Sequence, residues 1–555
     1  MKLGFTRRTI APLLALPLLL VSAQTVAQQL MHVPFAYPRI VGVTSPTALS
    51  PELQQIARAQ GSMPVENPGG GVAYYGYRDD HPNLMPVLGS NVEASKTEPD
   101  KNTYLVLDGQ SGPDLDFDYG RRFLYQGHEG PAAPGKGYVT RINLDADLQH
   151  RVTVLATKEA DGVTDLPTFD GSTWYPWSGR LLFTAEGNGT TTGGVWQATA
   201  DFPSRVVPLL GVMGRGGFEG IQADSAGNLW IVEDIGGAVP TGQSAARVPN
   251  SFIFRFVPSN RHDLTQGGKM QVLQVMSMST PGKPIRFQAA SALTQDIQNL
   301  HTYGIVFDTK WVTIHDTGVN GFGVFNANQL AKDAGGTPFK RPENGMFRPG
   351  THFREFYFTE TGDTNATTVA APDHGGFGGI QKLTQASPSA DTGKLTLFFR
   401  GDLEHTAFDN LAFWDADRMV AVEDRGETLH TQGNALDSGW LLDARVDYSG
   451  SASPVRIIAQ GRDPSATIDA ALLGSAGFVN DGDNELTGIH VSDGDPDANG
   501  ILGAKVPRPF KDGWRMFYTQ QHGDNVTYEI VRQPRAGDRR GHADDDDDRW
   551  QLSRP

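Results

Sequence analysis

FEGIQADSAGNLWIVED, residues 218–234, and FDNLAFWDADRMVAVED, residues 408–424, are two 17-residue segments built on the same plan. Each begins with an acid after a Phe, turns at an Asp, and ends an apolar strand in Glu-Asp. The turn residues between the two apolar runs predict a β-hairpin in each segment. Repeated strands that deliver carboxylates at one end predict a radially repeated β fold with a metal site near its axis.

Looser versions of this pattern recur along the chain. Further apolar strands lead into an acid or into His-Gly-Asp at residues 120–130, 179–187, 354–363 and 514–524. Any one of these acids alone would be an ordinary turn residue. Six together predict an all-β fold of the β-propeller type, in which equivalent strand ends meet at one face. The irregular spacing requires irregular insertions between the blades.

Composition agrees with a large β protein that attracts cations. The 555 residues include 65 Gly and 35 Pro, which favours short strands and tight turns over long helices. The chain has no cysteine, which excludes disulfides, thiolate ligands and a cysteine nucleophile. A formal net charge of -16 opposes binding to nucleic acid or anionic lipid, although export and solubility alone would also account for it. Nothing in the sequence indicates the oligomeric state.

The N-terminus has the pattern of an export signal. Lys2, Arg7 and Arg8 precede the apolar run 10–21, and Thr25-Val26-Ala27 resembles a cleavage site. We predict a signal peptide at residues 1–27, Sec or Tat export, and a periplasmic or extracellular location. The run is too short to span a membrane, and no later segment predicts a span.

Four regions follow from the distribution of strands and turns. The signal peptide precedes an irregular N-terminal wrap at residues 28–100, which are rich in Pro, Gly and Asn. Residues 101–532 form one β-propeller domain of short strands. Residues 533–555 form a disordered acidic tail that includes five consecutive aspartates.

The strand-end acids favour a hard cation. Calcium takes six to eight oxygen ligands, and carboxylates and Asn side chains such as Asp409 and Asn410 supply them. The His-Glu-x-x-His and cysteine patterns of zinc sites are absent. Neither a Gly-x-Ser-x-Gly elbow nor a Walker A loop occurs.

Arg341-Pro342-Glu343 is a second candidate site. In an extended chain the side chains of Arg341 and Glu343 point to the same side. Glu343 would then bind a metal while the Arg341 guanidinium holds a phosphate or carboxylate. The alternative is a surface Arg-Glu pair in a loop, which the spacing alone favours.

Four pieces of the chain, in the same order, resemble PhoX-type alkaline phosphatases. FLYQGHE at residues 123–129 resembles that family's strand ending in Asn-His-Glu, and GRLLFTAEG at residues 179–187 resembles its strand ending in Thr-Cys-Glu-Glu. Arg341-Pro342-Glu343 resembles its Arg-Pro-Glu segment. Residues 485–488 with residues 521–524 resemble its closing Glu-x-Thr-Gly and Gln-His-Pro-Gly pattern. The resemblance spans roughly residues 120 to 525 of the chain.

The resemblance implies a six-bladed propeller that hydrolyses phosphoesters, with calcium and an iron centre on its axis. By matching position, Arg341 would hold the phosphate and act in catalysis together with Glu343. The implied metal ligands are Glu129, Glu186, Glu219 and Glu343, with Asp409 and Asn410 as weaker matches. Ala185 stands where the family has its metal-binding cysteine, and Gly187 where it has a second glutamate. We therefore expect calcium as the cofactor, with iron as an alternative that the missing cysteine opposes.

These observations predict a secreted, metal-dependent phosphomonoester hydrolase that acts on a small phosphoester. Two alternatives stay open. One is a calcium-dependent propeller lactonase, esterase or phytase-like hydrolase, because Phe218-Glu219-Gly220 also suits such propellers. The other is a non-catalytic secreted propeller that binds calcium, which the loss of the cysteine at Ala185 would favour.

Overall fold

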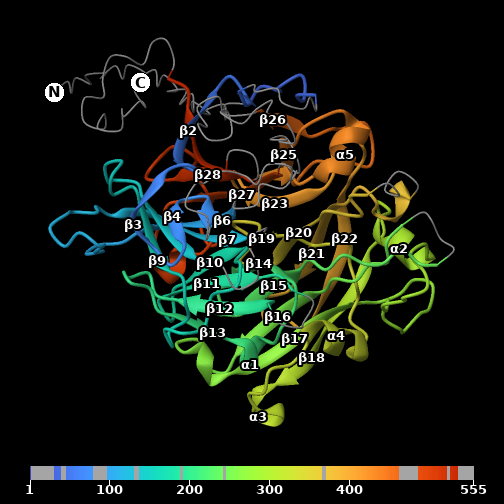
Figure 1. The fold of residues 1–555 in the computed structure, drawn as a ribbon. Helices are drawn as coiled ribbons and strands as arrows, with labels where there is room; N and C mark the ends of the chain where they lie inside the picture. The colour runs from blue at the N-terminus through green and yellow to red at the C-terminus, as the bar shows by residue number, and fades with distance from the viewer. Residues whose placement is uncertain are drawn as a thin grey trace.

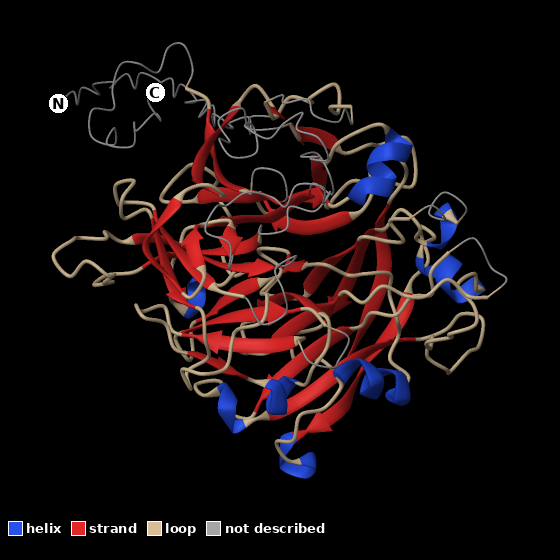
Figure 2. Ribbon diagram, in the orientation of Figure 1, coloured by secondary structure: helices blue, strands red, loops and turns tan. Residues whose placement is uncertain are grey.

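The computed structural model describes residues 1, 30–38, 46–78, 97–129, 137–187, 192–241, 246–365, 371–461, 485–521 and 525–534. The described chain is almost entirely strands and loops (Figures 1 and 2). Two four-stranded antiparallel sheets come first: β6–β9 (Glu98–Val106, Arg122–Glu129, Val139–Asn143, Val152–Ala156) and β10–β13 (Ser172–Tyr175, Arg180–Ala185, Gly194–Ala198, Val206–Pro208).

A nine-stranded sheet follows. It holds β14–β18 (Phe218–Ala223, Leu229–Glu233, Ile253–Pro258, Gly268–Val275, Phe307–Asp316) and β19–β22 (Gly345–Phe347, Glu355–Glu360, Gly379–Gln385, Thr392–Arg400), which join where β18 pairs with β22. The last strands are β23–β26 (Phe408–Phe413, Arg418–Glu423, Ser438–Asp443, Val455–Ala459) and β27–β29 (Glu485–Ser492, Arg515–Gln521, Val526–Arg532).

The first strands of these groups form a ring. β6, β10, β14, β19, β23 and β27 contact one another in this order, and β27 contacts β6. In Figure 1 the groups accordingly follow one another around the middle of the view in chain order. The prediction of an all-β propeller is confirmed. The number of six blades stays a prediction, because the β18–β22 pairing merges two of the groups into one sheet.

The segment expected to be an irregular wrap, residues 28–100, contains regular strands where it is described. β1 (Ala48–Leu49) pairs with β26, and β2 (Leu53–Gln60) pairs with β29. β3–β5 (Pro64–Gly69, Val72–Tyr74, Tyr77–Arg78) form a small sheet of their own. Two strands of this segment, β1 and β2, therefore extend sheets of the propeller. The domain boundaries stay predictions, and residues 2–29 and 535–555 lie outside the described residues.

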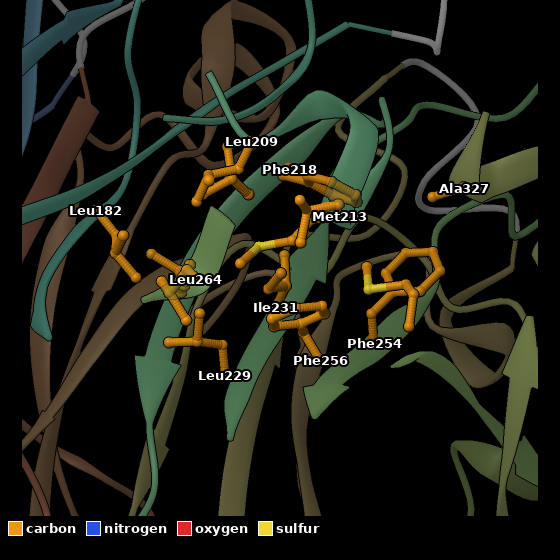
Figure 3. Close-up of a cluster of buried hydrophobic side chains, with 14 of the residues drawn as sticks. Leu182, Leu209, Met213, Phe218, Leu229, Ile231, Phe254, Phe256, Leu264 and Ala327 are labelled. Carbon is orange, nitrogen blue, oxygen red and sulfur yellow. The ribbon is translucent and has the colours of Figure 1, made fainter. Parts of the chain in front are cut away.

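Alternating apolar side chains bury the faces of neighbouring sheets against one another. Leu229 and Ile231 of β15 and Phe254 and Phe256 of β16 lie in one cluster, which Leu182 of β11 joins from the preceding sheet (Figure 3). The spacing of two puts these residues on one face of each strand. Burial of each such side chain contributes about 1.5–3 kcal/mol. This core holds the ring of first strands in place.

Helices are short and lie at the margins of the sheets (Figure 2). They are α1 (Leu210–Met213), α2 (Gln295–Leu300), α3 (Thr317–Asn320), α4 (Ala327–Ala334) and α5 (Gly426–Gly433), with 3-10 turns η1 (Leu264–Gln266), η3 (Pro372–His374) and η4 (Ala498–Gly500). In the part of the chain that is described, no helix has the length and apolar character needed to cross a membrane.

Candidate metal centre

Bulges at the start of the first strands turn acids toward the ring. The register between first and second strand shifts between Pro99 and Asn102, between Phe218 and Ile221, and between Phe408 and Leu411. A bulge bends the strand and re-aims its side chains. The residues inside these three bulges include Asp100, Glu219 and Asp409.

Two further acids, just before the first strands of two other groups, are equivalent in position to the acids in the bulges. Asp170 follows Phe169 and precedes β10 by two positions, and Glu343 follows Pro342 and precedes β19 by two positions. Asp170 and Glu343 therefore extend the set of acids to five of the six strands of the ring, β6, β10, β14, β19 and β23. Both are buried.

These acids and two strand ends form three overlapping groups of carboxylates. The groups are Asp100 with Glu129 and Asp170, Asp170 with Glu186 and Glu219, and Glu219 with Glu343 and Asp409. Within each group, one carboxylate oxygen from each residue lies within 4.8 Å of the others. Asp170 and Glu219 each belong to two groups, so the three groups form one continuous acidic cluster.

Hairpin pairing explains why the repeated motif carries acids at both ends. Phe218 pairs with Glu233 across the β14–β15 hairpin, and Phe408 pairs with Glu423 across β23–β24. The start and end of each motif therefore meet. The turn acid Asp224 lies at the other end of its hairpin, where it accepts hydrogen bonds from Trp230 Nε1 at 2.9 Å and from Asn228.

The first acid of each Glu-Asp pair has an internal role. Glu423 accepts hydrogen bonds from the backbone N–H groups of Thr406 and Ser438 and from Trp440 Nε1, at 3.0, 2.8 and 2.8 Å. Glu233 accepts from the backbone N–H of Phe252 and from Asn328 Nδ2. These glutamates tie strand ends to the next strands of their sheets.

The second acid of each pair faces Arg341. The guanidinium Nη2 of Arg341 lies 2.8 Å from Asp234 Oδ2, 3.3 Å from Glu343 Oε1 and 3.9 Å from Asp424 Oδ2. Its side chain is 23% exposed, whereas that of Glu343 is 8% exposed. Arg341 therefore joins the acidic cluster at a point that solvent reaches. Its φ of 54° is in the left-handed region, which is uncommon for an arginine.

Burial makes six carboxylates of the cluster hard to ionise. The pKa of each of Glu129, Asp170, Glu219, Glu343 and Asp409 is raised well above its ordinary value, and that of Glu186 is raised to about 8. Burial is the largest cause for every one of these groups, and nearby carboxylates add to it. A bound cation would favour the charged form of all of them.

The donor set fits a hard cation. Both carboxylate oxygens of Asp170 and Oδ2 of Asp409 are buried, and no described group donates a hydrogen bond to them. Buried polar atoms normally have a partner, so these oxygens are candidates for metal coordination. Oxygen atoms alone are the ligand type that calcium prefers.

A thiolate-bound iron centre does not fit this chain. Ala185 is fully buried and packs in an apolar cluster with Phe183 and Trp196. Gly187 has a φ of 148°, and a Cβ there would lie 2.5 Å from the backbone nitrogen of Gly193. The position of the family's second glutamate is therefore filled by backbone.

Five of the six predicted metal ligands lie in the three groups: Glu129, Glu186, Glu219, Glu343 and Asp409. Asn410 lies beside them, where its Nδ2 donates to Asp409 Oδ1 at 2.6 Å and its Oδ1 accepts from Asn344. Its role as a ligand, like those of the other five, stays a prediction. The closing motif at residues 522–524 lies outside the described residues.

Sequence reasoning missed Asp100 and Asp170. A signal for Asp170 was present, because Phe169-Asp170-Gly171 repeats the Phe-acid-Gly pattern of Phe218-Glu219-Gly220. Asp100 follows a proline in the segment expected to be an irregular wrap. The sequence around Asp100 does not alternate between polar and apolar residues. The position of Asp100 in the ring is therefore evident only from the folded structure.

Comparisons with known proteins agree with the predicted resemblance. Residues 241–439 match the family model described as alkaline phosphatase PhoX. This segment contains Arg341, Glu343 and Asp409. A comparison with curated proteins finds no match.

Among solved structures, Pseudomonas fluorescens PhoX in complex with vanadate, a transition state analogue, has a TM-score of 0.53 at 12% identity, covering 91% of this chain and 98% of that one. A GH43_1 enzyme from Xanthomonas citri has a TM-score of 0.29 at 12% identity, covering 67% and 92%. An auxiliary nutrient binding protein from Bacteroides thetaiotaomicron has a TM-score of 0.35 at 9% identity, covering 87% and 77%. The family match confirms the resemblance predicted from sequence and supports a phosphoric monoester hydrolase of the PhoX alkaline phosphatase type. The Pseudomonas structure shows that the chain shares the fold of a PhoX protein.

Proposed function

We propose that the protein is an exported, metal-dependent hydrolase of small phosphate monoesters, and that its active site is the acidic cluster with Arg341. The observation that carries this proposal is the contact between Arg341 and Glu343, which lies within the matched segment and at the edge of the carboxylate groups. The Pseudomonas protein of similar fold binds vanadate, a transition state analogue.

The carboxylates would hold the metal. Asp100, Glu129, Asp170, Glu186, Glu219, Glu343 and Asp409 supply the oxygens, with Asn410 beside them. Calcium ions bound there would neutralise phosphate oxygens and polarise the phosphorus, which is the chemistry that metals supply in phosphoryl transfer. Iron stays an alternative that the absence of cysteine opposes.

Arg341 would bind the phosphate. Its guanidinium is partly open to solvent, and Asp234 and Thr364 fix its orientation through Nε and Nη1. A guanidinium held in this way can present two N–H groups to the equatorial oxygens of a phosphoryl group. Thr361 Oγ1 donates to Glu343 Oε1 at 2.6 Å, which orients Glu343 beside Arg341.

The test uses purified protein stripped with EDTA and reloaded with calcium. We expect turnover of p-nitrophenyl phosphate with calcium and loss of turnover in EDTA. Metal analysis of the protein as isolated should find calcium without iron. Inactivity with every divalent cation tried, at neutral and alkaline pH, would reject the proposal.

A panel of substrates distinguishes a phosphomonoesterase from the alternative of a lactonase, esterase or phytase-like hydrolase. Lactones and phytate offered to the calcium-loaded protein should be turned over more slowly than p-nitrophenyl phosphate. If a lactone were the better substrate, the protein would be assigned as a lactonase and the phosphatase proposal would be rejected. Export is tested separately by mass spectrometry. Protein recovered from the periplasm or the medium should have the mass of the chain without residues 1–27.

A further inference from the structure

Six equivalent positions of the ring follow the five inward acids and, on β27, Thr487, and the residues at these positions fall into two classes. At Gly171, Gly220 and Gly488 the backbone of the next strand of the ring approaches closely. A Cβ at Gly171 would lie 2.3 Å from the carbonyl oxygen of Glu219, and one at Gly220 would lie 2.8 Å from that of Glu343. Only glycine fits such an approach. The three equivalent positions that carry side chains are Lys101, Asn344 and Asn410.

These three side chains form a hydrogen-bonded chain inside the ring. Lys101 Nζ donates to Asn344 Oδ1 at 3.2 Å, and Asn344 Nδ2 donates to Asn410 Oδ1 at 3.0 Å. Asn410 Nδ2 lies 3.2 Å from Thr487 Oγ1, which donates to Asp100 Oδ1 at 2.6 Å. This series of hydrogen bonds therefore ends at Asp100, the residue next to Lys101.

Lys101 reaches across the ring. It lies on β6, whereas Asn344 directly precedes β19, and these strands are three places apart in either direction around the ring. The side chain is 1% exposed. A buried ammonium is costly unless opposite charge compensates it.

The compensating charges belong to the acidic cluster. Burial lowers the pKa of Lys101 to about 8, and the carboxylates of Asp100, Asp409 and Glu219 oppose this by favouring the charged form. Asp100 belongs to the first carboxylate group, Glu219 to the second and third, and Asp409 to the third. One positive charge therefore faces all three groups, at one of the six equivalent positions in the described ring.

The cavity that Lys101 lines is too small for a substrate. Lys101 lines a cavity of about 30 Å³ together with Asn102, Ser172 and His490. Such a volume holds about one or two water molecules. This cavity therefore leaves no room for a phosphoester beside Lys101.

We propose that Lys101 is a built-in positive charge of the acidic cluster, held across the ring by Asn344, and that it sets how tightly the carboxylates bind divalent cations. This inference rests on the proposed function, since it presumes that the cluster binds cations. It makes Lys101 a tuning residue for metal affinity, which is distinct from a ligand and from a catalytic residue.

The experiment measures the free calcium concentration at half-saturation of the metal-stripped protein by calorimetric titration, without any activity assay. Lys101→Met keeps the length of the side chain and removes its charge. Lys340→Met is the matched control, because Lys340 is equally buried but its Nζ pairs with Asp363, at 2.9 and 3.0 Å, outside the three groups.

We expect half-saturation of Lys101→Met at a calcium concentration about tenfold or more lower than for the wild type, because a repulsive charge is removed. Its melting temperature in EDTA should fall, because the carboxylates lose a counter-charge. Lys340→Met should also melt at a lower temperature but should keep the wild-type half-saturation. A merely structural role of Lys101 would lower stability without tightening calcium binding.

If Lys101→Met does not fold in EDTA, the variant is purified in calcium. The rate of calcium release is then measured with a fluorescent chelator. Slower calcium release than from the wild type supports the proposal. Unchanged or faster release, or unchanged half-saturation, overturns it while the proposed function stands. A wild-type protein that binds no divalent cation overturns both.

Discussion

Nε of Arg341 donates hydrogen bonds to both carboxylate oxygens of Asp234, at 3.1 and 2.9 Å. Asp234 ends the earlier copy of the repeated motif, and Arg341 precedes the strand β19 of the following group. The contact therefore links two groups of strands at the edge of the acidic cluster. It also fixes one edge of the guanidinium, which is what a phosphate-binding arginine requires.

Arg341→Lys should lower kcat/KM for p-nitrophenyl phosphate by about 100-fold or more, because an ammonium lacks the planar fork that binds two phosphate oxygens. Arg348→Lys is the control: Arg348 pairs with Glu355, outside the carboxylate groups, and its replacement should leave kcat/KM within about twofold. Equal losses in both variants would contradict a phosphate-binding role for Arg341.

Asp170→Asn should weaken calcium binding about tenfold or more, because it removes one anionic oxygen shared by two carboxylate groups. In EDTA at pH 8 the same variant should melt at a higher temperature than the wild type, since a repelling acid is gone. Asp224→Asn is the matched control, because this buried turn acid accepts hydrogen bonds from Trp230 and Asn228. It should lose about 1–3 kcal/mol with and without calcium. Parallel behaviour of the two variants would mean that Asp170 has only a structural role.

Stability without metal should fall as pH rises from about 4.5 to 8. Burial raises the pKa of Glu186 and of Glu233 in the folded protein to about 8. The folded state therefore keeps protons that the unfolded state releases above its ordinary carboxyl pKa, so the unfolded state gains relative stability with pH until the folded pKa is passed. Melting temperatures in EDTA at several pH values test this.

Calcium should remove most of this dependence, because bound cations keep the cluster carboxylates ionised in the folded state. Glu233 lies outside the three carboxylate groups, so its share of the decline should persist in calcium. A melting temperature in EDTA that rises across the same range would contradict the prediction.

Glu423→Gln should destabilise the protein by about 3–5 kcal/mol in calcium, because it removes the charge that pairs with the buried Arg425. Urea unfolding would measure the loss, and calcium binding should persist. Glu404→Gln is the control, since Glu404 is 62% exposed and pairs with Arg456. It should cost at most about 1 kcal/mol. A small effect of Glu423→Gln would show that its backbone contacts survive the substitution.

The sequence predicted the site best where a local pattern and the fold coincide. Glu219 and Asp409 were recognisable because each opens a hairpin whose other end, Glu233 or Glu423, lies at a fixed distance along the chain. Glu129 and Glu186 were recognisable as ends of apolar strands. These are short-range features, and they set both the propeller and most of the acidic cluster.

Long-range features were not predictable in the same way. Asp100 and Lys101 lie in a strand whose burial comes from both neighbouring sheets, so it shows no alternation of polar and apolar residues. The partner of Lys101 is Asn344, which is remote in sequence. The strands β1 and β2 depend on edges provided by β26 and β29, near the other end of the chain. No local pattern encodes such pairings.

The pairing of β2 with β29 also has a consequence for biogenesis. Leu53 is opposite Arg532, so the outermost strand of the last group comes from a part of the chain made early, and its partner from a part made late. The pairing of β2 with β29 can form only after residue 532 has been synthesised, and such distant pairing is intrinsically slow. The carboxylates converge from sheets spread around the ring, so cation capture should follow its closure. Calcium bound as proposed would then disfavour reopening of the finished ring.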